Sequence, residues 1–517
     1  MRTETLLPDT VESVKEGVIK DTAWYGFATY LSQGLGIVSA VLIRRFLGPA
    51  GMGVWTALML LPTYTNYSHF GILNAAEREI PFLNGKKEWR EAARVRNVTF
   101  AVMLVAASFS VLALLGLALW QRDSSPPEVT ASFPWVILVA LGQLGFGYFG
   151  VLARTAKQFR DLGLLAMAAA ILNIVAIVVL TSRFGVSGML LATAIVYAGM
   201  AIYLALRLGS PLRPEIHWRE IKHLSAIGLP IMLYSIITDT LMNIDKITTV
   251  ALLGTTSLGI YTLATMVKTY AWTVPSVIGI VLYPRLQERY GATGDLNTLK
   301  NMFLYPMAIL AGLTPILIGA LYFGTVFLAH TLLPDYVSGL GSVRNMVVGT
   351  FFLAITLPAA QLLVTLNKQI VLILIGLIGV ATAVGLNTVL VHRGMDIAGI
   401  ALGTSFAYFV TATATIFRAA RTYLPSLADR FRLILETFVP FVYATLILFG
   451  LDLLLPTDQF GGATTIVIIL VKLTLFTVAC LPLVWYADRQ TLLVGAVRAA
   501  FVTRLHGLRR PAKGNRL

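Results

Sequence analysis

The sequence is poor in charged residues and has a single cysteine. Asp, Glu, Lys and Arg make up 13% of its 517 residues, about half of the share that soluble globular chains carry. Apolar residues make up 57%, too many to be hidden in soluble cores, so most of the chain must be solvated by lipid. This excludes a cytosolic enzyme, a secreted module and a disordered regulator. The lone Cys480 excludes a disulfide framework and a cysteine-based zinc site.

Signatures of catalysis are also missing. The six histidines form no HExxH pattern or other metal-ligand spacing, and no GxSxG nucleophile motif is present. A GxGxxG pattern runs from Gly145 to Gly150, but it lies inside an apolar run with no strand before it, so close helix packing explains it better. We therefore expect no enzymatic activity, no resident cofactor and no metal site.

Apolar stretches long enough to cross a bilayer recur along the whole chain. A helix of about 20 residues crosses about 30 Å of hydrocarbon. Fourteen stretches satisfy this, at 22–43, 53–75, 97–120, 133–154, 162–182, 187–207, 225–250, 257–282, 301–324, 342–365, 369–391, 397–417, 434–455 and 463–486. We predict an all-α polytopic membrane protein with about 14 transmembrane helices. The first 20 residues have no apolar core and no cleavage site, so they do not form a signal peptide.

Basic residues favour one side of the predicted spans. The formal net charge of +15 would suggest nucleic acid in a soluble protein. Here 31 of the 40 Lys and Arg fall on the side of the N-terminus, and six fall on the other side. Because Lys and Arg are enriched in cytoplasmic loops, we predict that both termini lie in the cytoplasm. The predicted location is the cytoplasmic (inner) membrane. Membrane lipids, and no nucleic acid, are the expected partners of these charges.

The two halves of the chain resemble each other. Residues 47–56 match 253–262 at an offset of 206, and residues 188–193 match 399–404 at an offset of 211. Six spans in each half would give both halves the same orientation, related by an axis along the membrane normal. We predict an N-lobe at 22–208, a C-lobe at 225–418 and two additional helices at 434–486. The remaining segments, expected on the cytoplasmic side, are 1–21, 209–224, 419–433 and 487–517.

Polar residues follow helical spacing along four spans. A charge in mid-bilayer costs about 2.5–3.5 kcal/mol on insertion scales, so it is expected to face protein or a wet cavity. One stripe contains Asp239 and Lys246, and the next contains Tyr261, Lys268 and Trp272. We predict that such stripes from both lobes line one central cavity. Its candidate binding residues are Arg44, Arg45, Asn66, Lys246, Tyr261, Lys268 and Trp272.

Two simpler interpretations stand beside the cavity. Arg44 and Arg45 are equally compatible with side chains that snorkel to the membrane interface. Tyr261 and Trp272 are equally compatible with interfacial anchors.

Short motifs at equivalent connections point to a known family. They are Arg45-Phe46-Leu47-Gly48-Pro49, Arg78-Glu79-Ile80-Pro81, Asp245-Lys246 and Leu258-Gly259-Ile260-Tyr261. With the layout of spans, they resemble the polysaccharide transporter or oligosaccharide flippase family. This is the Wzx-like branch of the MOP flippase superfamily, which also contains the MATE antiporters and the lipid II flippases. The resemblance extends over nearly the whole chain.

The resemblance implies transport of a polyprenyl-diphosphate-linked oligosaccharide, such as a polysaccharide or O-antigen repeat unit, by alternating access. A diphosphate needs cationic contacts, which Arg44, Lys246 and Lys268 could supply. Tyr261 and Trp272 could stack on sugar rings. A polysaccharide polymerase machinery is an implied partner.

A coupling-ion site is also implied by the resemblance. Lipid II flippases have a sodium site built from their seventh, eleventh and twelfth helices. Asp239, Asn387 and Thr404 lie on comparable spans here, with Na⁺ or H⁺ as the possible coupling ion. Val391 stands where a second carboxylate would be expected, which leaves sodium coupling open.

Other functions are compatible with the same composition. A MATE-like cation-coupled drug exporter would favour carboxylates and aromatics in its cavity, and a lipid II-type flippase would share the layout. A glycan polymerase or ligase would need a large outer loop, whereas no predicted loop exceeds about 20 residues. We therefore expect a flippase for a lipid-linked oligosaccharide.

Overall fold

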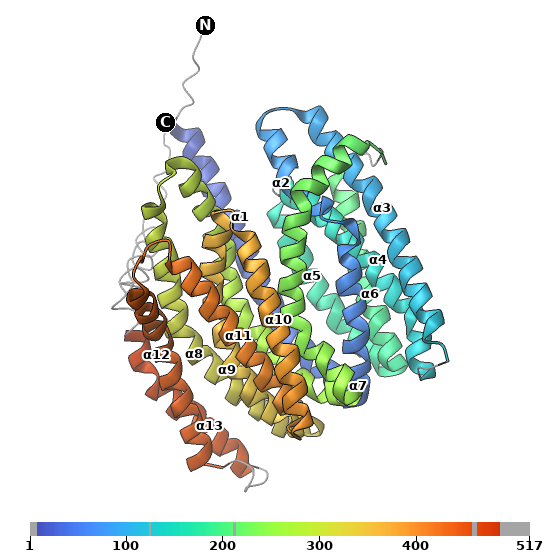
Figure 1. Ribbon diagram of the computed structural model, residues 1–517. Helices are drawn as coiled ribbons and strands as arrows, with labels where there is room; N and C mark the ends of the chain where they lie inside the picture. Colours follow the sequence, from blue (N-terminus) through green and yellow to red (C-terminus); the bar gives the residue numbers. More distant parts are fainter. Residues whose placement is uncertain (1–7, 124–125, 157, 210–212, 457–462, 486–517) are drawn as a thin grey trace, which may run out of the picture. The chain divides into compact units, whose positions relative to one another are not determined.

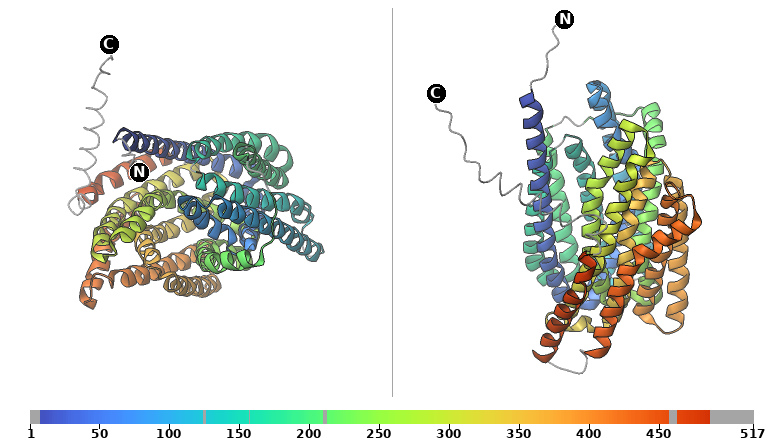
Figure 2. Two further views of the ribbon diagram at one scale, coloured as in Figure 1. Left: turned by 90° about the horizontal axis from the view of Figure 1, so that it is seen from above. Right: turned by 90° about the vertical axis from the view of Figure 1, so that its left-hand side faces the viewer.

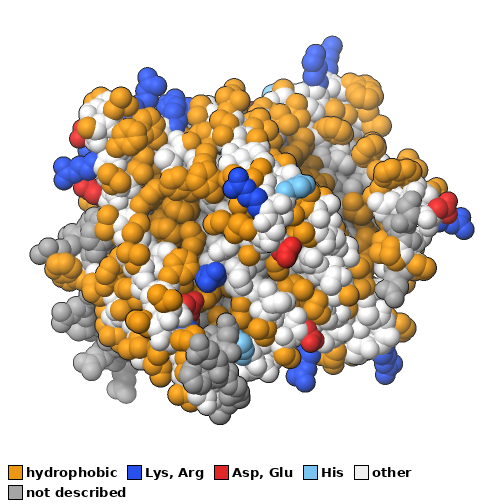
Figure 3. All heavy atoms as spheres, turned by 60° about the horizontal axis from the view of Figure 1, so that its bottom comes forward, with side chains coloured by type: hydrophobic (Ala, Val, Ile, Leu, Met, Phe, Trp, Pro, Cys, Tyr) orange, Lys and Arg blue, Asp and Glu red, His pale blue; other side chains and the backbone are white. Residues whose placement is uncertain are grey.

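The chain folds entirely into helices in the part that the structure describes. The computed structural model describes residues 8–123, 126–156, 158–209, 213–456 and 463–485. Every regular element in these ranges is a helix (Figure 1), because helices satisfy their own backbone hydrogen bonds where lipid offers none. Hydrophobic side chains cover a large part of the face shown in Figure 3, and most of its Lys and Arg side chains lie near the edge of the view. The predicted all-α, multi-pass class is confirmed.

Eleven helical stretches of the described residues are long and apolar enough to cross a membrane. The three longest are Leu31–His69, Phe159–Leu208 and Trp218–Gly279. Each contains a glycine with non-helical backbone and positive φ, at Gly48 (+61°), Gly185 (+55°) and Gly254 (+81°), a conformation that residues with a Cβ rarely adopt. These glycines lie between spans that the sequence analysis separated. The number of fourteen crossings stays a prediction.

The described residues group into two compact units. Unit 1 consists of Met1–Thr240 and Thr249–Thr262, and unit 2 of Leu241–Thr248 and Leu263–Leu517. The long helix α7 (Trp218–Thr293) contributes to both units. Its segment around the Gly254 break therefore belongs with the N-terminal helices.

Unit 1 is built on helices that pack along their length. Its other elements are α1 (Pro8–Thr65), η1 (Asn66–His69), α2 (Ile72–Gly85), α3 (Trp89–Trp120), α4 (Pro127–Thr155), α5 (Phe159–Ala176), η2 (Ile177–Thr181) and α6 (Ser182–Leu208). Helix α4 packs against α6, and α1 packs against α5 (Figures 1 and 2). Ile72, Val98 and Tyr148 are buried in one cluster that joins α2, α3 and α4. Small residues allow close approach here, since a Cβ on Gly142 would lie 2.9 Å from the Cβ of Tyr197.

Unit 2 has a similar all-helical construction. After its part of α7 it contains η3 (Leu296–Leu299), α8 (Lys300–Thr331), η4 (Pro334–Gly339), α9 (Leu340–Thr365), α10 (Gln369–His392), α11 (Asp396–Ala420), α12 (Leu427–Leu454) and α13 (Ala463–Ala479). Helix α11 packs against α9 and α10, and α8 packs against α9, α12 and α13. The ring of Phe476 lies on Gly319 of α8, where a Cβ would come within 2.0 Å of it. The additional helices thus dock on α8.

The helix predicted over 53–75 is interrupted, which corrects the sequence analysis. Helix α1 ends at Thr65, a 3₁₀ turn follows, and α2 begins only at Ile72. Phe70 and Gly71 have φ of +47° and +81°. A Cβ on Gly71 would lie 2.4 Å from the carbonyl carbon of Gly228, so this close approach of two backbones explains the break. In transporters, interrupted helices commonly border binding sites.

Candidate functional site

The interrupted segment carries a carboxylate contact. The hydroxyl of Tyr67 donates a hydrogen bond to Oδ2 of Asp239 on α7, within unit 1. Both side chains are half-buried, as is Asn66, the residue before Tyr67. The structure therefore places the predicted Asn66 and the partner of the predicted Asp239 in the same turn. Tyr67 itself was missed, because a regular helix would direct it away from the stripe that contains Asn66.

Unit 2 contains a buried ion pair. Nζ of Lys268 lies 2.5 Å from Oδ2 of Asp245 and 2.8 Å from the carbonyl oxygen of Met242, and it donates to both. The side chains of Lys268 and Asp245 are 4% and 0% exposed. Desolvated charges are retained when they are paired in this way. The positive charge predicted at Lys268 is present, but it is balanced by a carboxylate that the sequence analysis had not paired with it.

Lys246 has a different environment. Its Nζ donates to Oδ1 of Asn243 at 2.9 Å, one turn earlier on α7, and its side chain is half-buried. The hydrogen-bond partner of this ammonium group is a neutral amide rather than a carboxylate. The two lysines therefore differ. In the described residues the ammonium of Lys268 bonds to a carboxylate, whereas that of Lys246 bonds to an uncharged amide.

Asn387 and Thr404, two of the three candidate coupling-ion residues, are in contact in unit 2. The fully buried amide of Asn387 donates to Oγ1 of Thr248 at 2.9 Å and to Oγ1 of Thr404 at 3.2 Å. The neighbouring Gly403 makes room, since a Cβ there would lie 2.3 Å from Oδ1 of Asn387. The residue of α7 in this group is Thr248, whereas Asp239 bonds to Tyr67 in unit 1.

The remaining predicted residues differ in exposure. Arg44 is 4% exposed, and its terminal nitrogens donate to the carbonyl oxygens of Ala40 and Thr262, both at 2.8 Å. Arg45 is exposed, as expected of a side chain that snorkels. Tyr261 is fully buried, and Trp272 is half-buried.

The two matching connections of the sequence repeat contact each other inside unit 1. A Cβ on Gly53 would lie 1.7 Å from the carbonyl oxygen of Thr255, and a Cβ on Gly259 would lie 1.7 Å from that of Pro49. Pro49 and Gly53 correspond to Thr255 and Gly259 at the offset of 206. The contact is therefore reciprocal. Backbone atoms thus join α1 to the segment Thr249–Thr262 of α7. The hydrogen bond from Arg44 to Thr262 joins the same two segments.

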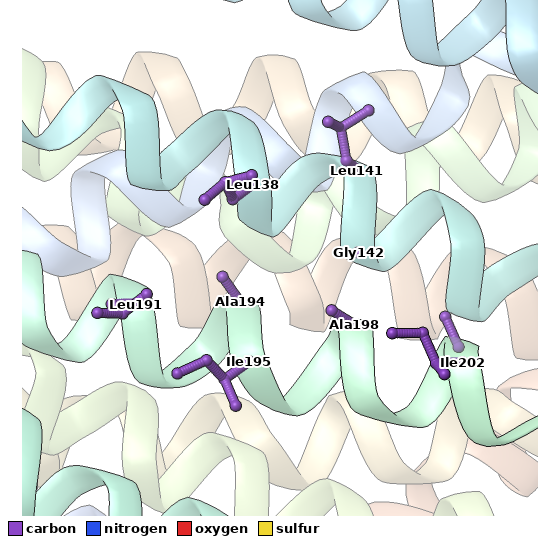
Figure 4. Close-up of a pocket in the computed structure, with 9 residues that line it drawn as sticks. Leu138, Leu141, Gly142, Leu191, Ala194, Ile195, Ala198 and Ile202 are labelled. Carbon is purple, nitrogen blue, oxygen red and sulfur yellow. The ribbon is translucent and has the colours of Figure 1, made fainter.

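Unit 1 also has an apolar cavity of about 360 Å³ between α4 and α6 (Figure 4). Its lining includes Leu138, Leu141, Leu191 and Ile195, and no charged side chain. Such a lining suits hydrocarbon rather than a sugar or a phosphate. No group of three or more His, Cys, Asp or Glu in the described ranges is placed to hold a metal ion.

Solved structures of known transporters have the same architecture. Three solved structures share it over most of their length. A structure described as the inward-facing conformation of a multidrug resistance MATE family transporter of the MOP superfamily gives a TM-score of 0.64 at 14% identity, covering 78% of this chain and 95% of that one. Lipid II flippase MurJ in an inward closed conformation gives 0.62 at 13%, covering 88% and 97%. A MOP superfamily transporter from Pyrococcus furiosus gives 0.60 at 13%, covering 78% and 95%. The chain has the fold of these transporters.

The family follows from the sequence match. A search of curated proteins finds no match. The family model described as polysaccharide biosynthesis protein matches residues 18–289, more than half of the chain. The chain belongs to this family, and it is a multi-pass membrane protein.

Proposed function

We propose that the protein is a flippase that moves a polyprenyl-diphosphate-linked oligosaccharide across the cytoplasmic membrane by alternating access. The observation that carries this proposal is that the family match at 18–289 includes the helices bearing Arg44, Asp239, Lys246 and Lys268. A diphosphate requires cationic hydrogen-bond donors, and a glycan requires polar surroundings. The lipid tail stays in the hydrocarbon while the head group crosses. We therefore propose transport rather than catalysis.

The cationic groups would take part in a defined order. The ammonium group of Lys246, which donates to the neutral amide of Asn243, would meet the phosphates first. Lys268 is bonded to Asp245 in unit 2, and Arg44 to two carbonyl oxygens in unit 1. A phosphate that bound Lys268, or one that bound Arg44, would have to replace those bonds. An exchange of this kind links substrate binding to a conformational change, because it removes contacts that stabilise the present arrangement.

Ion coupling would use the carboxylate and amide groups described above. Asp239 is the candidate for H⁺ or Na⁺, and Asn387 and Thr404 supply neutral oxygen atoms of the kind that hard cations prefer. The half-buried Trp272 is the candidate for contact with a sugar ring and Asn66 for a glycan hydroxyl, whereas the fully buried Tyr261 has no exposed ring face.

The proposed orientation places both termini in the cytoplasm. In unit 2, Lys368 lies beside Arg418 and Arg421, and the count of basic residues assigns these three to the proposed cytoplasmic side. Burial, followed by these two guanidinium groups, lowers the pKa of Lys368. Such groups favour the anionic surface of a membrane. The proposed partners are the lipid-linked glycan, membrane lipids and a polysaccharide polymerase machinery.

The test is translocation in proteoliposomes that contain a labelled polyprenyl-diphosphate oligosaccharide, with a glycosidase added on one side. We expect the protein to move the glycan to the side of the glycosidase, which then cleaves it. Cleavage should be strongly reduced with Lys246→Gln. Lys300→Gln, which changes an exposed lysine at the start of α8, serves as the matched control and should transport normally. A protein that leaves the glycan protected would contradict the proposal.

A drug exporter of the MATE type is the second candidate, supported by the Tyr67–Asp239 contact in an interrupted helix. The same vesicles loaded with a cationic dye separate the two functions. Dye movement without glycan movement would identify an exporter, and movement of lipid II alone would identify a lipid II-type flippase.

A further inference from the structure

A second cavity of unit 1, with a polar lining, lies at one end of the unit, away from the residues discussed above. It has a volume of about 250 Å³ and is located where α2 and α4 end, α3 begins and α6 ends. Its polar lining consists of Asn84, Trp89, Arg96 and Thr155, and apolar side chains such as Leu152 complete it. The lining contains no Asp or Glu.

Arg96 is the one charged group of this cavity, and it has no acidic partner in the described part of the chain. Its Nε is buried and forms no hydrogen bond there. The two neighbouring arginines differ, because Arg94 pairs with Glu91 at 2.8 Å and Arg154 pairs with Glu77 at 2.6 Å. A half-buried guanidinium with an unsatisfied donor is unfavourable unless an external acceptor completes it.

The other polar groups are mostly donors. The amide of Asn84 forms no hydrogen bond within the described residues and can donate through Nδ2. The indole of Trp89, 62% exposed, can donate through Nε1, whereas the hydroxyl of Thr155 already donates to the carbonyl oxygen of Leu152. Guanidinium, amide and indole donors without any carboxylate form a site for an anion with several acceptor oxygens. A phosphate group has this character.

The surroundings indicate a lipid as the source of that phosphate. Trp89, Leu206 and Trp218 are large, exposed side chains at this end of unit 1, and tryptophan is typical of the membrane interface. Leu206 is 78% exposed two residues before the cavity residue Leu208, with which α6 ends. Acyl chains could therefore extend along the apolar helix surface while the phosphate enters the cavity.

We propose that this cavity binds the phosphate group of a membrane phospholipid, with Arg96 as its principal contact and Asn84 and Trp89 as further donors. The corresponding connection of unit 2, between α7 and α8, has a cavity of about 500 Å³ whose lining includes Arg285 and Asn301 and again no Asp or Glu. The two residue types are exchanged across the connection, because Asn84 precedes it and Arg96 follows it in unit 1, whereas Arg285 precedes it and Asn301 follows it in unit 2. The proposal does not depend on which substrate the protein transports.

The test measures binding to the purified, delipidated full-length protein in detergent, by the change in thermal unfolding. The probes are dioctanoyl phosphatidylglycerol, dioctanoyl glycerol with the same chains but no phosphate, and inorganic phosphate. We expect stabilisation by the phosphatidylglycerol alone. Affinity should fall about tenfold or more in Arg96→Gln, since a charge-assisted hydrogen bond is lost, and should stay within about twofold in Arg94→Gln, the matched control on the same helix.

Each other outcome has a definite meaning. Equal stabilisation by dioctanoyl glycerol would show that the chains bind without the phosphate, and would overturn the proposal. Equal stabilisation by inorganic phosphate would assign the cavity to free phosphate instead of a lipid. Undiminished binding to Arg96→Gln would remove the site. If Arg96→Gln does not fold, Asn84→Asp provides the same test, because a carboxylate of nearly unchanged size would repel a phosphate, and normal binding to that variant would equally contradict the proposal.

Discussion

The ammonium group of Lys268 lies 2.5 Å from the carboxylate of Asp245, and both side chains are almost completely buried. Neither charge would be stable at this depth without the other, because removing one partner leaves an uncompensated buried charge. The pair is therefore a structural requirement of unit 2 before it has any role in transport. Tests of Lys268 must separate the two effects.

Lys268→Met alone is expected to destabilise the protein by about 3–5 kcal/mol, since Asp245 is left buried and unpaired. The double variant Lys268→Met/Asp245→Asn should recover most of that loss, because both charges are absent. Unfolding in a detergent mixture measures these differences. Should the double variant be as unstable as the single one, the ion pair would not be the cause. A double variant that folds but does not transport would indicate that the charge itself serves the proposed function.

Gly53→Ala is expected to destabilise unit 1 by about 1–3 kcal/mol, the usual cost of forcing extra volume into a packed contact. The added Cβ would lie 1.7 Å from a backbone oxygen of Thr255, which must move. Gly259→Ala should have the same effect from the other side. The loss of stability in the double variant should be smaller than the sum of the two single losses, because moving the two connections apart once relieves both clashes.

Gly199→Ala is the control for this series. It lies inside α6, and a Cβ added there would meet no atom within 4 Å, so alanine should be neutral or stabilise the helix by up to about 1 kcal/mol. Strict additivity of Gly53→Ala and Gly259→Ala would show that the two contacts are independent.

Asp239→Asn is expected to abolish any dependence of the transport rate on pH or Na⁺, because it removes the titratable carboxylate that accepts the bond from Tyr67. The measurement is glycan translocation over a pH series, in sodium and in potassium buffers. Asp396→Asn, which changes an exposed carboxylate at the start of α11, should leave the dependence intact. A rate that responds to pH or sodium equally in Asp239→Asn and in the unaltered protein would exclude coupling at this residue.

Gly319→Ala is expected to weaken the docking of α13 on α8 by about 1–3 kcal/mol, because the new methyl group meets the ring of Phe476. Gly324→Ala, five residues later on α8 with nothing near its Cα, should not destabilise. Proteolysis or thermal unfolding can follow both. Partial recovery in Gly319→Ala/Phe476→Leu would identify the ring as the obstacle, and no recovery would point elsewhere.

The fold was largely predictable because its physical cause is visible in the composition. Apolar runs in a bilayer must form helices, and the breaks at Gly48, Gly185 and Gly254 fall between predicted spans. The interruption after Thr65 was not predictable, because it depends on the approach of Gly71 to Gly228, 157 residues away. Periodicity along one segment carries no information on such a partner.

The sequence indicated polar residues within the spans but not the pairs that they form. Helical spacing singled out Asp239, Lys246 and Lys268, and in the structure Asn387 bonds to Thr404. The pairing of Lys268 with Asp245 was hidden, because the two are 23 positions apart on a helix that is broken at Gly254. Spacing rules hold only along a regular helix.

The reciprocal contact at Gly53 and Gly259 has the geometry of an isologous interface, in which residue i of one copy meets residue j of the other and the reverse also holds. Here Gly53 meets Thr255 and Gly259 meets Pro49, so each connection carries both surfaces of the contact. A single six-helix repeat would therefore be complementary to a second copy of itself at this point. A half-length ancestor could have assembled as a homodimer through the same few backbone atoms that now join two parts of one chain.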